Sequence, residues 1–332
     1  MKRIRVLESF PEPRPTTNPY LVQLVRSLDS SERLIVRRFS WKEALTGDYD
    51  VLHLHWPDAL LAGRNRLSRF LKLLAVVVLM IRLSIRRTPI VRTVHNARPH
   101  ESTLRARWVE RLAGRRTRVR IHLNDTEARL AGDIVIPHGD YRAWYSQLPR
   151  ESVRDDTISY VGLIRPYKGV EDLIAAFRSL GESGTEMMLE IAGAPRTTAL
   201  AEALTELIGD APNIRTTFAF LPDDAFVRQV TSSRLVVLPY REMSNSGVAL
   251  AVLSLDRPIL VPRSAHTLAL QREVGARWVA LFDAPLTAPQ LGAALESVHP
   301  PVVGEVVAFT SRDWGEVAQR HVDAFETALR RH

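Results

Sequence analysis

Short runs of apolar residues alternate with longer amphipathic stretches along the first 145 residues of this chain. Val, Ile and Leu fill the runs, and polar or turn-forming residues bound each one, which is typical of buried strands. Between several runs the apolar positions recur every three or four residues, which predicts helices over 19–28 and 104–113. The alternation predicts a parallel sheet with helices on both faces. Its expected strands are 4–7, 34–36, 51–54, 90–94, 119–123 and 133–136.

The second half of the chain repeats this rhythm. Helices are expected over 170–180 and 198–208, between further short apolar runs. The pattern breaks at Pro137-His138-Gly139, and a polar stretch follows. We therefore expect two doubly wound Rossmann-like domains, one over 1–145 and one over 146–310. The expected strands of the second domain are 157–161, 187–192, 214–218, 235–238, 258–261 and 279–282.

Charge is divided unevenly between the two halves. Residues 1–150 hold 28 Lys and Arg against 14 Asp and Glu, a net +14, whereas the rest holds 17 against 23, a net −6. A basic first domain indicates either a polyanionic partner or a merely solvated basic face. Nucleic acid, anionic lipid and a pyrophosphate-carrying acceptor are candidates, but there is no nucleic-acid motif and aromatic residues are only 7%. We expect no nucleic-acid partner.

Cysteine is absent, which excludes disulfides and a thiolate nucleophile and fits a reducing compartment. No long apolar stretch precedes the first acid, Glu8, so we expect no signal peptide and a cytoplasmic protein.

The segment 67–88 is unusually apolar. Its longest uncharged run, residues 73–81, is nine residues, well short of the ~20 needed to span a bilayer. Arg64, Arg66, Arg69 and Lys72 precede this run, and Arg82, Arg86 and Arg87 follow it. Two interpretations stay open: a buried crossover helix of the first sheet, or a helix in the headgroup region of an anionic membrane.

Two stretches of the second domain carry candidate chemistry. In the first, a strand turns through Gly162 toward a helix, and Arg165 and Lys168 lie in the turn. Two cations, with N–H groups at the start of the following helix, could bind a diphosphate, whose charge grows as it leaves a sugar.

In the second, a strand ends at Pro239, and Glu242 precedes a loop of small residues that opens a helix. That loop, Ser244-Asn245-Ser246-Gly247, is suited to capping the helix and to donating N–H groups. Glu242 could accept hydrogen bonds from sugar hydroxyls.

Together, these two stretches at this separation resemble the second domain of GT-B glycosyltransferases of the family-4 ("glycosyltransferases group 1") type. The resemblance covers residues 157–262 well and the first half only at short segments. It implies two Rossmann-like domains facing a cleft, with a nucleotide-diphosphate sugar held by Gly162, Arg165, Lys168, Glu242, Asn245, Ser246 and Gly247. No metal and no cofactor are expected, since Arg and Lys would bind the phosphates.

Short matches in the first half extend the resemblance. Thr93-Val94-His95 resembles the segment whose His lies beside the reacting sugar, which makes His95 the expected active-site His. The segment opened by Trp314 resembles a closing helix, here 311–332, that returns to the first domain. With His53-Leu54-His55-Trp56-Pro57-Asp58, the chain looks most like bacterial exopolysaccharide glycosyltransferases, whose acceptors are lipid-linked sugars. The resemblance thus implies transfer from a UDP- or GDP-sugar to a lipid-linked or glycan acceptor, by a peripheral enzyme at the inner face of the membrane.

The chain also departs from that family. Leu163 replaces the usual Arg, the loop after Glu242 is one residue longer, Ala251 stands near the usual second Glu, and Thr16-Thr17-Asn18-Pro19 replaces a Gly-Gly loop. The donor base, the sugar and the stereochemistry therefore stay open.

The stereochemistry decides which residues are needed. Retention needs positioning and charge stabilisation, whereas inversion also needs a base from the first domain, for which Asp58 and Glu101 are candidates. His53 and His55 flank one residue of a strand, and we expect one of them to be buried. Two other functions remain possible: a GT-B sugar-nucleotide epimerase, and a non-catalytic polyanion-binding protein.

Overall fold

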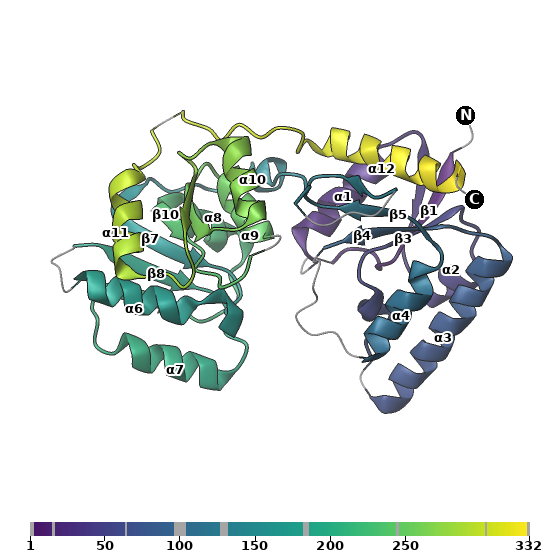
Figure 1. Ribbon diagram of the computed structural model, residues 1–332, viewed down its shortest axis with the longest axis horizontal. Coiled ribbons are helices and arrows are strands. Elements are labelled where there is room, and N and C mark those ends of the chain that lie inside the picture. Colours follow the sequence, from purple (N-terminus) through teal and green to yellow (C-terminus); the bar gives the residue numbers. More distant parts are fainter. Residues whose placement is uncertain are drawn as a thin grey trace. The chain divides into compact units, whose positions relative to one another are not determined.

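The computed structural model describes residues 3–14, 17–63, 65–95, 104–126, 132–181, 186–243, 246–302 and 304–330 (Figure 1). The chain forms two compact units, Met1–Gly139 with Ser311–His332 (unit 1) and Asp140–Thr310 (unit 2). The division falls six residues before the expected boundary at 145. Tyr141 precedes helix α5 (Arg142–Tyr145) and Tyr145 is its last residue; both are buried in the core of unit 2 and draw this segment into it.

Unit 1 is built on a six-stranded sheet in the order β2-β1-β3-β4-β5-β6, with every pair parallel. Each strand expected from the sequence is present, with ends shifted by at most two residues. One shift matters for the site: β1 continues one residue beyond the expected end and so includes Glu8. The strands are β1 (Ile4–Glu8), β2 (Leu34–Arg37), β3 (Val51–Leu54), β4 (Ile90–Val94), β5 (Thr117–His122) and β6 (Ile134–Val135).

Helices cover both faces of this sheet, as Figure 1 shows. Helices α1 (Pro19–Asp29) and α12 (Trp314–Arg330) pack together on one face, and α12 contacts β3, β4 and β5. Helices α2 (Trp41–Thr46), α3 (Arg66–Ile85) and α4 (Leu104–Gly114) pack on the other. A separate apolar core lies on each face. The last helix of the chain is thus part of unit 1.

Unit 2 contains a second parallel sheet, in the order β12-β11-β10-β7-β8-β9. One continuous apolar core surrounds it. Its strands are β7 (Arg154–Val161), β8 (Met188–Ala192), β9 (Ile214–Thr217), β10 (Ser233–Val237), β11 (Ile259–Pro262) and β12 (Val279–Phe282). Its longer helices are α6 (Val170–Gly181), α7 (Thr198–Ile208), α8 (Asp223–Ser232), α9 (Gly247–Ser254), α10 (Ala265–Val274) and α11 (Ala288–Ser297).

Helix α3 has two apolar faces, one buried and one exposed. Asn65 caps its start by accepting a hydrogen bond from the Ser68 N–H at 2.8 Å. Val76, Leu79, Met80 and Leu83 are buried against unit 1. Another row of large apolar side chains is exposed: Leu67, Phe70, Leu71, Leu74, Val78, Ile81 and Ile85. Within the described part of the chain, no helix combines the length and apolar character needed to cross a bilayer.

Candidate functional site

The carboxyl ends of β1 and β3 mark the point where the strand order of unit 1 reverses. β2 lies on one side of β1, and β3 to β6 follow on the other. Doubly wound sheets bind ligands outside the carboxyl ends of their strands, at this switch point. Glu8 ends β1, His53 lies near the end of β3 and His55 directly follows it. Three ionisable side chains therefore gather where the fold places a ligand.

Glu8 accepts hydrogen bonds from two histidine rings. Its Oε1 lies 2.9 Å from Nδ1 of His53 and its Oε2 lies 3.1 Å from Nε2 of His55, and all three side chains are buried. Burial alone would raise the pKa of this carboxyl, but the attraction of His53 and the hydrogen bonds from both rings lower the pKa of Glu8 well below its ordinary value. Glu8 is thus a buried carboxylate, and both rings must donate to it.

His55 connects Glu8 to His95 through hydrogen bonds at both of its ring nitrogens. Burial, together with the neighbouring His53, lowers the pKa of His55 to about 4, so its ring is neutral near pH 7. With the proton on Nε2, its Nδ1 accepts a hydrogen bond from Nε2 of His95, 3.1 Å away. The hydrogen-bond chain therefore assigns the His95 proton to Nε2 and leaves Nδ1 as an acceptor. Burial and the nearby His55 and His138 also lower the pKa of His95 well below its ordinary value.

Aromatic side chains fix the His95 ring. It stacks on Trp56 at a centroid distance of 4.0 Å and an interplanar angle of 15°, and meets the edge of Tyr20 at 5.6 Å and 87°. His95 is partly exposed, whereas His55 is buried. The chain Glu8–His55–His95 thus runs from the core to the surface of unit 1.

On the other side, His53 is held by β4 and α12. Its Nε2 lies 2.9 Å from Oγ1 of Thr93, and its ring lies 5.5 Å from that of His321 and 5.3 Å from that of Phe325. The expectation that only one of His53 and His55 is buried is wrong. Residues i and i+2 of a strand share a face, and both rings turn toward Glu8.

Of the two carboxyls predicted as bases, the structure describes only Asp58, which is not part of the hydrogen-bond chain Glu8–His55–His95. Asp58 is exposed on the 3-10 helix η1 (Pro57–Leu61), without a hydrogen bond or ion pair in the described structure. Glu101 lies outside the described residues.

Ligand atoms of Glu8, His53 and His55 lie within 4.8 Å of one another, the only such group among the described residues with the make-up of a metal site. The same atoms make the hydrogen bonds Glu8–His53 and Glu8–His55, so an ion could bind only by replacing those bonds.

Unit 2 has its own switch point, between β7 and β10. The two candidate stretches follow these two strands. Gly169 lets the two stretches approach closely, and Gly162 and Gly193 let the first stretch approach the turn after β8. Gly169, in the left-handed conformation with φ 60°, lies so close to Pro239 that a Cβ would be 2.2 Å from its carbonyl oxygen. Gly162 has φ 121°, and its carbonyl oxygen would be 1.8 Å from a Cβ on Gly193. The structure therefore brings the two stretches together at the place where this fold binds ligands.

Lys168 is positioned by the second stretch. Its Nζ donates to the Tyr240 hydroxyl at 2.8 Å and lies 4.3 Å from the centre of that ring. Arg165 instead lies against its own loop, where Nη1 donates to the carbonyl oxygens of Ile164 at 2.8 Å and Ala194 at 3.2 Å. Lys168 is thus held beside the switch point, whereas one guanidinium nitrogen of Arg165 is used in hydrogen bonds to the backbone of the turn.

The start of α9 follows the expected capping pattern. Ser246 is its N-cap and accepts a hydrogen bond from the Ala249 N–H at 3.3 Å, and Gly247 begins the helix. Glu242 is exposed before this loop, and Asn245 lies outside the described residues.

Helix α6 is a poorer anion site than the sequence indicated. Its first turn carries Glu171 and Asp172, and Asp172 accepts hydrogen bonds from Arg241. These acids already complement its N-terminus, so of the two helix starts α9 is better suited to a phosphate.

Sequence reasoning missed Glu8 and Tyr240. Glu8 carried a signal, because an acid at the end of a largely buried strand needs a partner. Its partners come from β3, however, and only the strand order brings β1 and β3 together. Tyr240 had no signal apart from its place after the strand.

The sequence of this chain is similar to that of two relatives over nearly its whole length. Two curated proteins from Xanthomonas campestris pv. campestris, each a GDP-mannose:glycolipid 4-beta-D-mannosyltransferase, are 35% identical to it over 98% of this chain and 93% of their own length. The sequence matches no profile of a known protein family.

Solved structures show the same fold at low identity. HepE of Anabaena, in complex with UDP-glucose, superposes with a TM-score of 0.62 at 13% identity and covers 99% of this chain and 98% of its own. AviGT4, a glycosyltransferase of avilamycin A biosynthesis, gives a TM-score of 0.59 at 14% identity, with 98% of both chains covered. The expected pair of doubly wound sheets, the GT-B fold, is confirmed.

Proposed function

We propose that this chain, which belongs to the glycosyltransferase family of the Xanthomonas GDP-mannose:glycolipid 4-beta-D-mannosyltransferases, transfers mannose from GDP-mannose to a lipid-linked glycan. The 35% identity over nearly the whole of both chains carries the proposal. It favours GDP over UDP, because the structures that hold UDP or UDP-glucose share only 13–14% identity with this chain. It also favours a transferase over the epimerase that was considered from the sequence.

We assign the donor to the switch point of unit 2. Lys168, held beside Tyr240, is proposed to bind the diphosphate, and the first N–H groups of α9, at Gly247 and Val248, have no acceptor inside their helix. Both favour the departing GDP, because its negative charge grows as the bond to the sugar breaks. Glu242, exposed beside this loop, is proposed to accept hydrogen bonds from sugar hydroxyls.

The named product of the relatives is a beta-mannoside, and GDP-mannose carries its sugar in the alpha linkage. Transfer of this kind inverts the anomeric carbon and needs a base for the acceptor hydroxyl. We assign that role to Nδ1 of His95, the nitrogen left without a proton by the chain to Glu8. The hydroxyl oxygen bonds to the anomeric carbon, its proton passes to Nδ1, and the bond to GDP breaks with its electron pair on GDP.

Glu8 and His55 act through His95. When His95 gains the proton it becomes a cation, and His55 and Glu8 connect that cation to a buried negative charge. The same bonds hold the ring in one orientation and one tautomer, as a buried carboxylate does in a catalytic triad. Glu8 and His55 are therefore positioning residues. Asp58 is exposed and lies outside the hydrogen-bond chain Glu8–His55–His95, so this mechanism does not need it as a base.

We propose that transfer proceeds without a metal ion. Lys168 and the start of α9 supply positive charge for the diphosphate, and the histidine and carboxylate atoms that could bind a metal are used in the chain to His95.

We further propose that the enzyme is peripheral at the inner, cytoplasmic face of a membrane. The exposed apolar row of α3, here called the α3 stripe, comprises Leu67, Phe70, Leu71, Leu74, Val78, Ile81 and Ile85. These seven positions recur at helical spacing over a helix of 20 residues. Arg66 and Arg69 lie at one end, Arg82 and Arg86 at the other, and such flanking cations favour an anionic lipid surface.

A groove beside the α3 stripe supports this assignment. Trp41, Leu67 and Leu71 line a cavity of about 410 Å³ at the start of α3. Tryptophan is enriched at membrane interfaces, where its ring is partly apolar and its N–H meets water.

A donor panel tests the proposed function. The purified chain is incubated with GDP-mannose, UDP-glucose or UDP-N-acetylglucosamine, with and without a glycolipid acceptor, and binding and products are measured. Of the three sugar nucleotides, only GDP-mannose should raise the melting temperature. It should be consumed only when the acceptor is present. Conversion of a sugar nucleotide without acceptor would indicate the epimerase. Salt-dependent nucleic-acid binding without any sugar-nucleotide binding would indicate the polyanion binder.

A further inference from the structure

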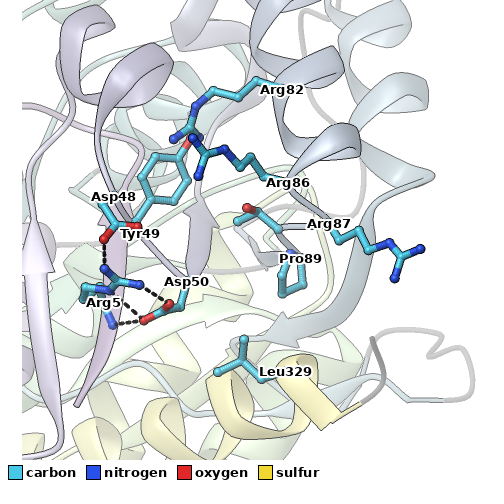
Figure 2. Close-up of a pocket in the computed structure, with 10 residues that line it drawn as sticks. Arg5, Asp48, Tyr49, Asp50, Arg82, Arg86, Arg87, Pro89 and Leu329 are labelled. Carbon is cyan, nitrogen blue, oxygen red and sulfur yellow. Dashed lines mark hydrogen bonds and ion pairs between the residues drawn. The ribbon is translucent and has the colours of Figure 1, made fainter. Parts of the chain in front are cut away.

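A polar pocket lies at one end of the strands of unit 1, and the hydrogen-bond chain Glu8–His55–His95 lies at the other end. Arg5 lies early in β1, Asp50 just before β3 and Pro89 just before β4, so the pocket opens at the amino ends of the strands (Figure 2). Its volume is about 280 Å³. The pocket is therefore separate from the proposed catalytic residues.

The acids of this pocket are already paired. Arg5 donates to Asp50 at 2.7 and 3.1 Å and forms an ion pair with Asp48 (Figure 2). The pocket also contains Arg82, Arg86 and Arg87, which gives its lining a net charge of +2 from four arginines and two aspartates. None of these three arginines has an ion pair in the described part of the chain.

Arg82 is fixed but incompletely bonded. Its Nη2 donates to the Gly47 carbonyl oxygen, and its guanidinium lies 4.6 Å from the centre of the Tyr49 ring. Its Nη1 is buried and has no hydrogen-bond partner in the described structure. A buried guanidinium nitrogen without an acceptor destabilises a fold, so an acceptor supplied to this group would stabilise it.

Arg86 points toward the same place. Figure 2 shows its guanidinium turned toward that of Arg82 above Tyr49, whereas Arg87 points away. Two like charges that converge without a carboxylate between them repel each other, and a bridging anion removes that repulsion. Arginine binds phosphate oxygens through paired N–H groups, which makes phosphate the anion best matched to this pair.

The helix dipole offers an alternative reason for the charge. Cations near the last turn of a helix are favourable, and Arg82 and Arg86 end α3. The dipole does not explain why Nη1 of Arg82 is buried without an acceptor, or why the two guanidinium groups converge.

Two arginines of the pocket neighbour the α3 stripe along the helix. Arg82 directly follows Ile81 and Arg86 directly follows Ile85, and positions four apart are neighbours on one side of a helix. Resting on the membrane docking proposed above, we infer that Arg82 and Arg86 form a binding site for the headgroup phosphate of an anionic phospholipid, one without a compensating ammonium group. The acyl chains of that lipid would lie along the stripe.

Vesicle binding by the full-length chain tests this site without measuring sugar transfer. Phosphatidylcholine vesicles carry either phosphatidic acid or oleate, adjusted to equal surface potential, so that only the phosphate differs. Arg86→Gln and the double variant R82Q/R86Q are compared with Arg66→Gln, an exposed arginine at the other end of the stripe. Thermal melts check folding, and Arg86→Gln is the variant least able to disturb it, because the Arg86 side chain is exposed and has no hydrogen bond or ion pair in the described structure.

The wild type should prefer phosphatidic acid, and Arg86→Gln should lose that preference, by roughly fivefold for one membrane-proximal charge. Arg66→Gln should weaken binding to both vesicle types alike and keep the preference. Equal wild-type binding to both vesicle types, or equal effects of the two substitutions, would overturn the pocket. Competition by dilute inorganic phosphate would identify a soluble ligand and overturn the lipid. No vesicle binding at all would instead contradict the membrane docking itself.

Discussion

Nε2 of His55 donates a hydrogen bond to Oε2 of Glu8 at 3.1 Å, and both side chains are completely buried in unit 1. This contact decides which nitrogen of His55 faces His95. It therefore also decides that Nδ1 of His95 accepts hydrogen bonds.

Glu8→Gln should lower kcat by about a hundredfold, because an amide neither fixes the His55 tautomer nor stabilises the His95 cation. KM for GDP-mannose should stay within a few-fold, since the donor is assigned to unit 2. Steady-state kinetics over a range of pH, with circular dichroism as a folding check, measure both. The exposed Glu316→Gln on α12 is the control. A KM effect without a kcat effect would contradict the positioning role.

His95→Ala should lower kcat by about 10²- to 10⁴-fold, which is the usual contribution of a general base. Asp58→Asn should change kcat by no more than a few-fold, because Asp58 is exposed and outside the hydrogen-bond chain. Parallel assays under identical conditions compare the two. The reverse ranking would return the base to the carboxyl predicted from sequence.

Lys168→Ala should weaken GDP-mannose binding by about 10- to 150-fold, from the roughly 1.5–3 kcal/mol of a hydrogen bond to a charged group. Tyr240→Phe keeps the ring under Lys168 but removes the hydroxyl acceptor, so its effect should be smaller. Titration calorimetry measures the dissociation constants, with the exposed Lys42→Ala as control. Unchanged binding in the Lys168 variant would remove it from the donor site.

Stability should fall as the pH decreases from about 6.5 to about 4. Burial lowers the pKa of His55 to about 4 and that of His321 to about 3. Below pH 6.5 the unfolded chain therefore binds protons that the folded chain refuses, at a cost of about 1.4 kcal/mol per pH unit for each ring. Glu8, whose folded pKa is also lowered, adds a loss in the same direction below about its ordinary value of 4.5.

Urea unfolding at a series of pH values measures this slope. His321→Leu should flatten it by about one histidine. A slope that does not change in that variant would show that His321 titrates alike in both states.

Much of the fold was predictable because apolar periodicity reports burial. All twelve strands lie where the sequence places them, within a few residues. The ends of the strands were less predictable. β7 begins at Arg154, three residues before the expected start, and these first three residues are exposed and polar. Helices α8, α10 and α11 were not predicted, since their short apolar patterns resemble those of loops.

The site was predictable only where local sequence carries it. The turn at Gly162 and the cap at Ser246 depend on neighbouring residues, and both form as expected. The pairing of Glu8 with His53 and His55 depends on β1 lying beside β3, and strand–helix alternation does not determine strand order. Sequence reasoning therefore named His95, Asp58 and Glu101 from local patterns, and it missed Glu8 because the partners of Glu8 come from another strand.

The configuration of the product tests the central claim most directly. The wild-type chain and His95→Ala are incubated with GDP-mannose and a glycolipid acceptor, and the new glycosidic bond is examined by NMR. We predict a beta-linked mannoside from the wild type and almost none from the variant. An alpha-linked product, or full activity in the variant, would contradict a mechanism in which Glu8 and His55 hold His95 as the base for inversion.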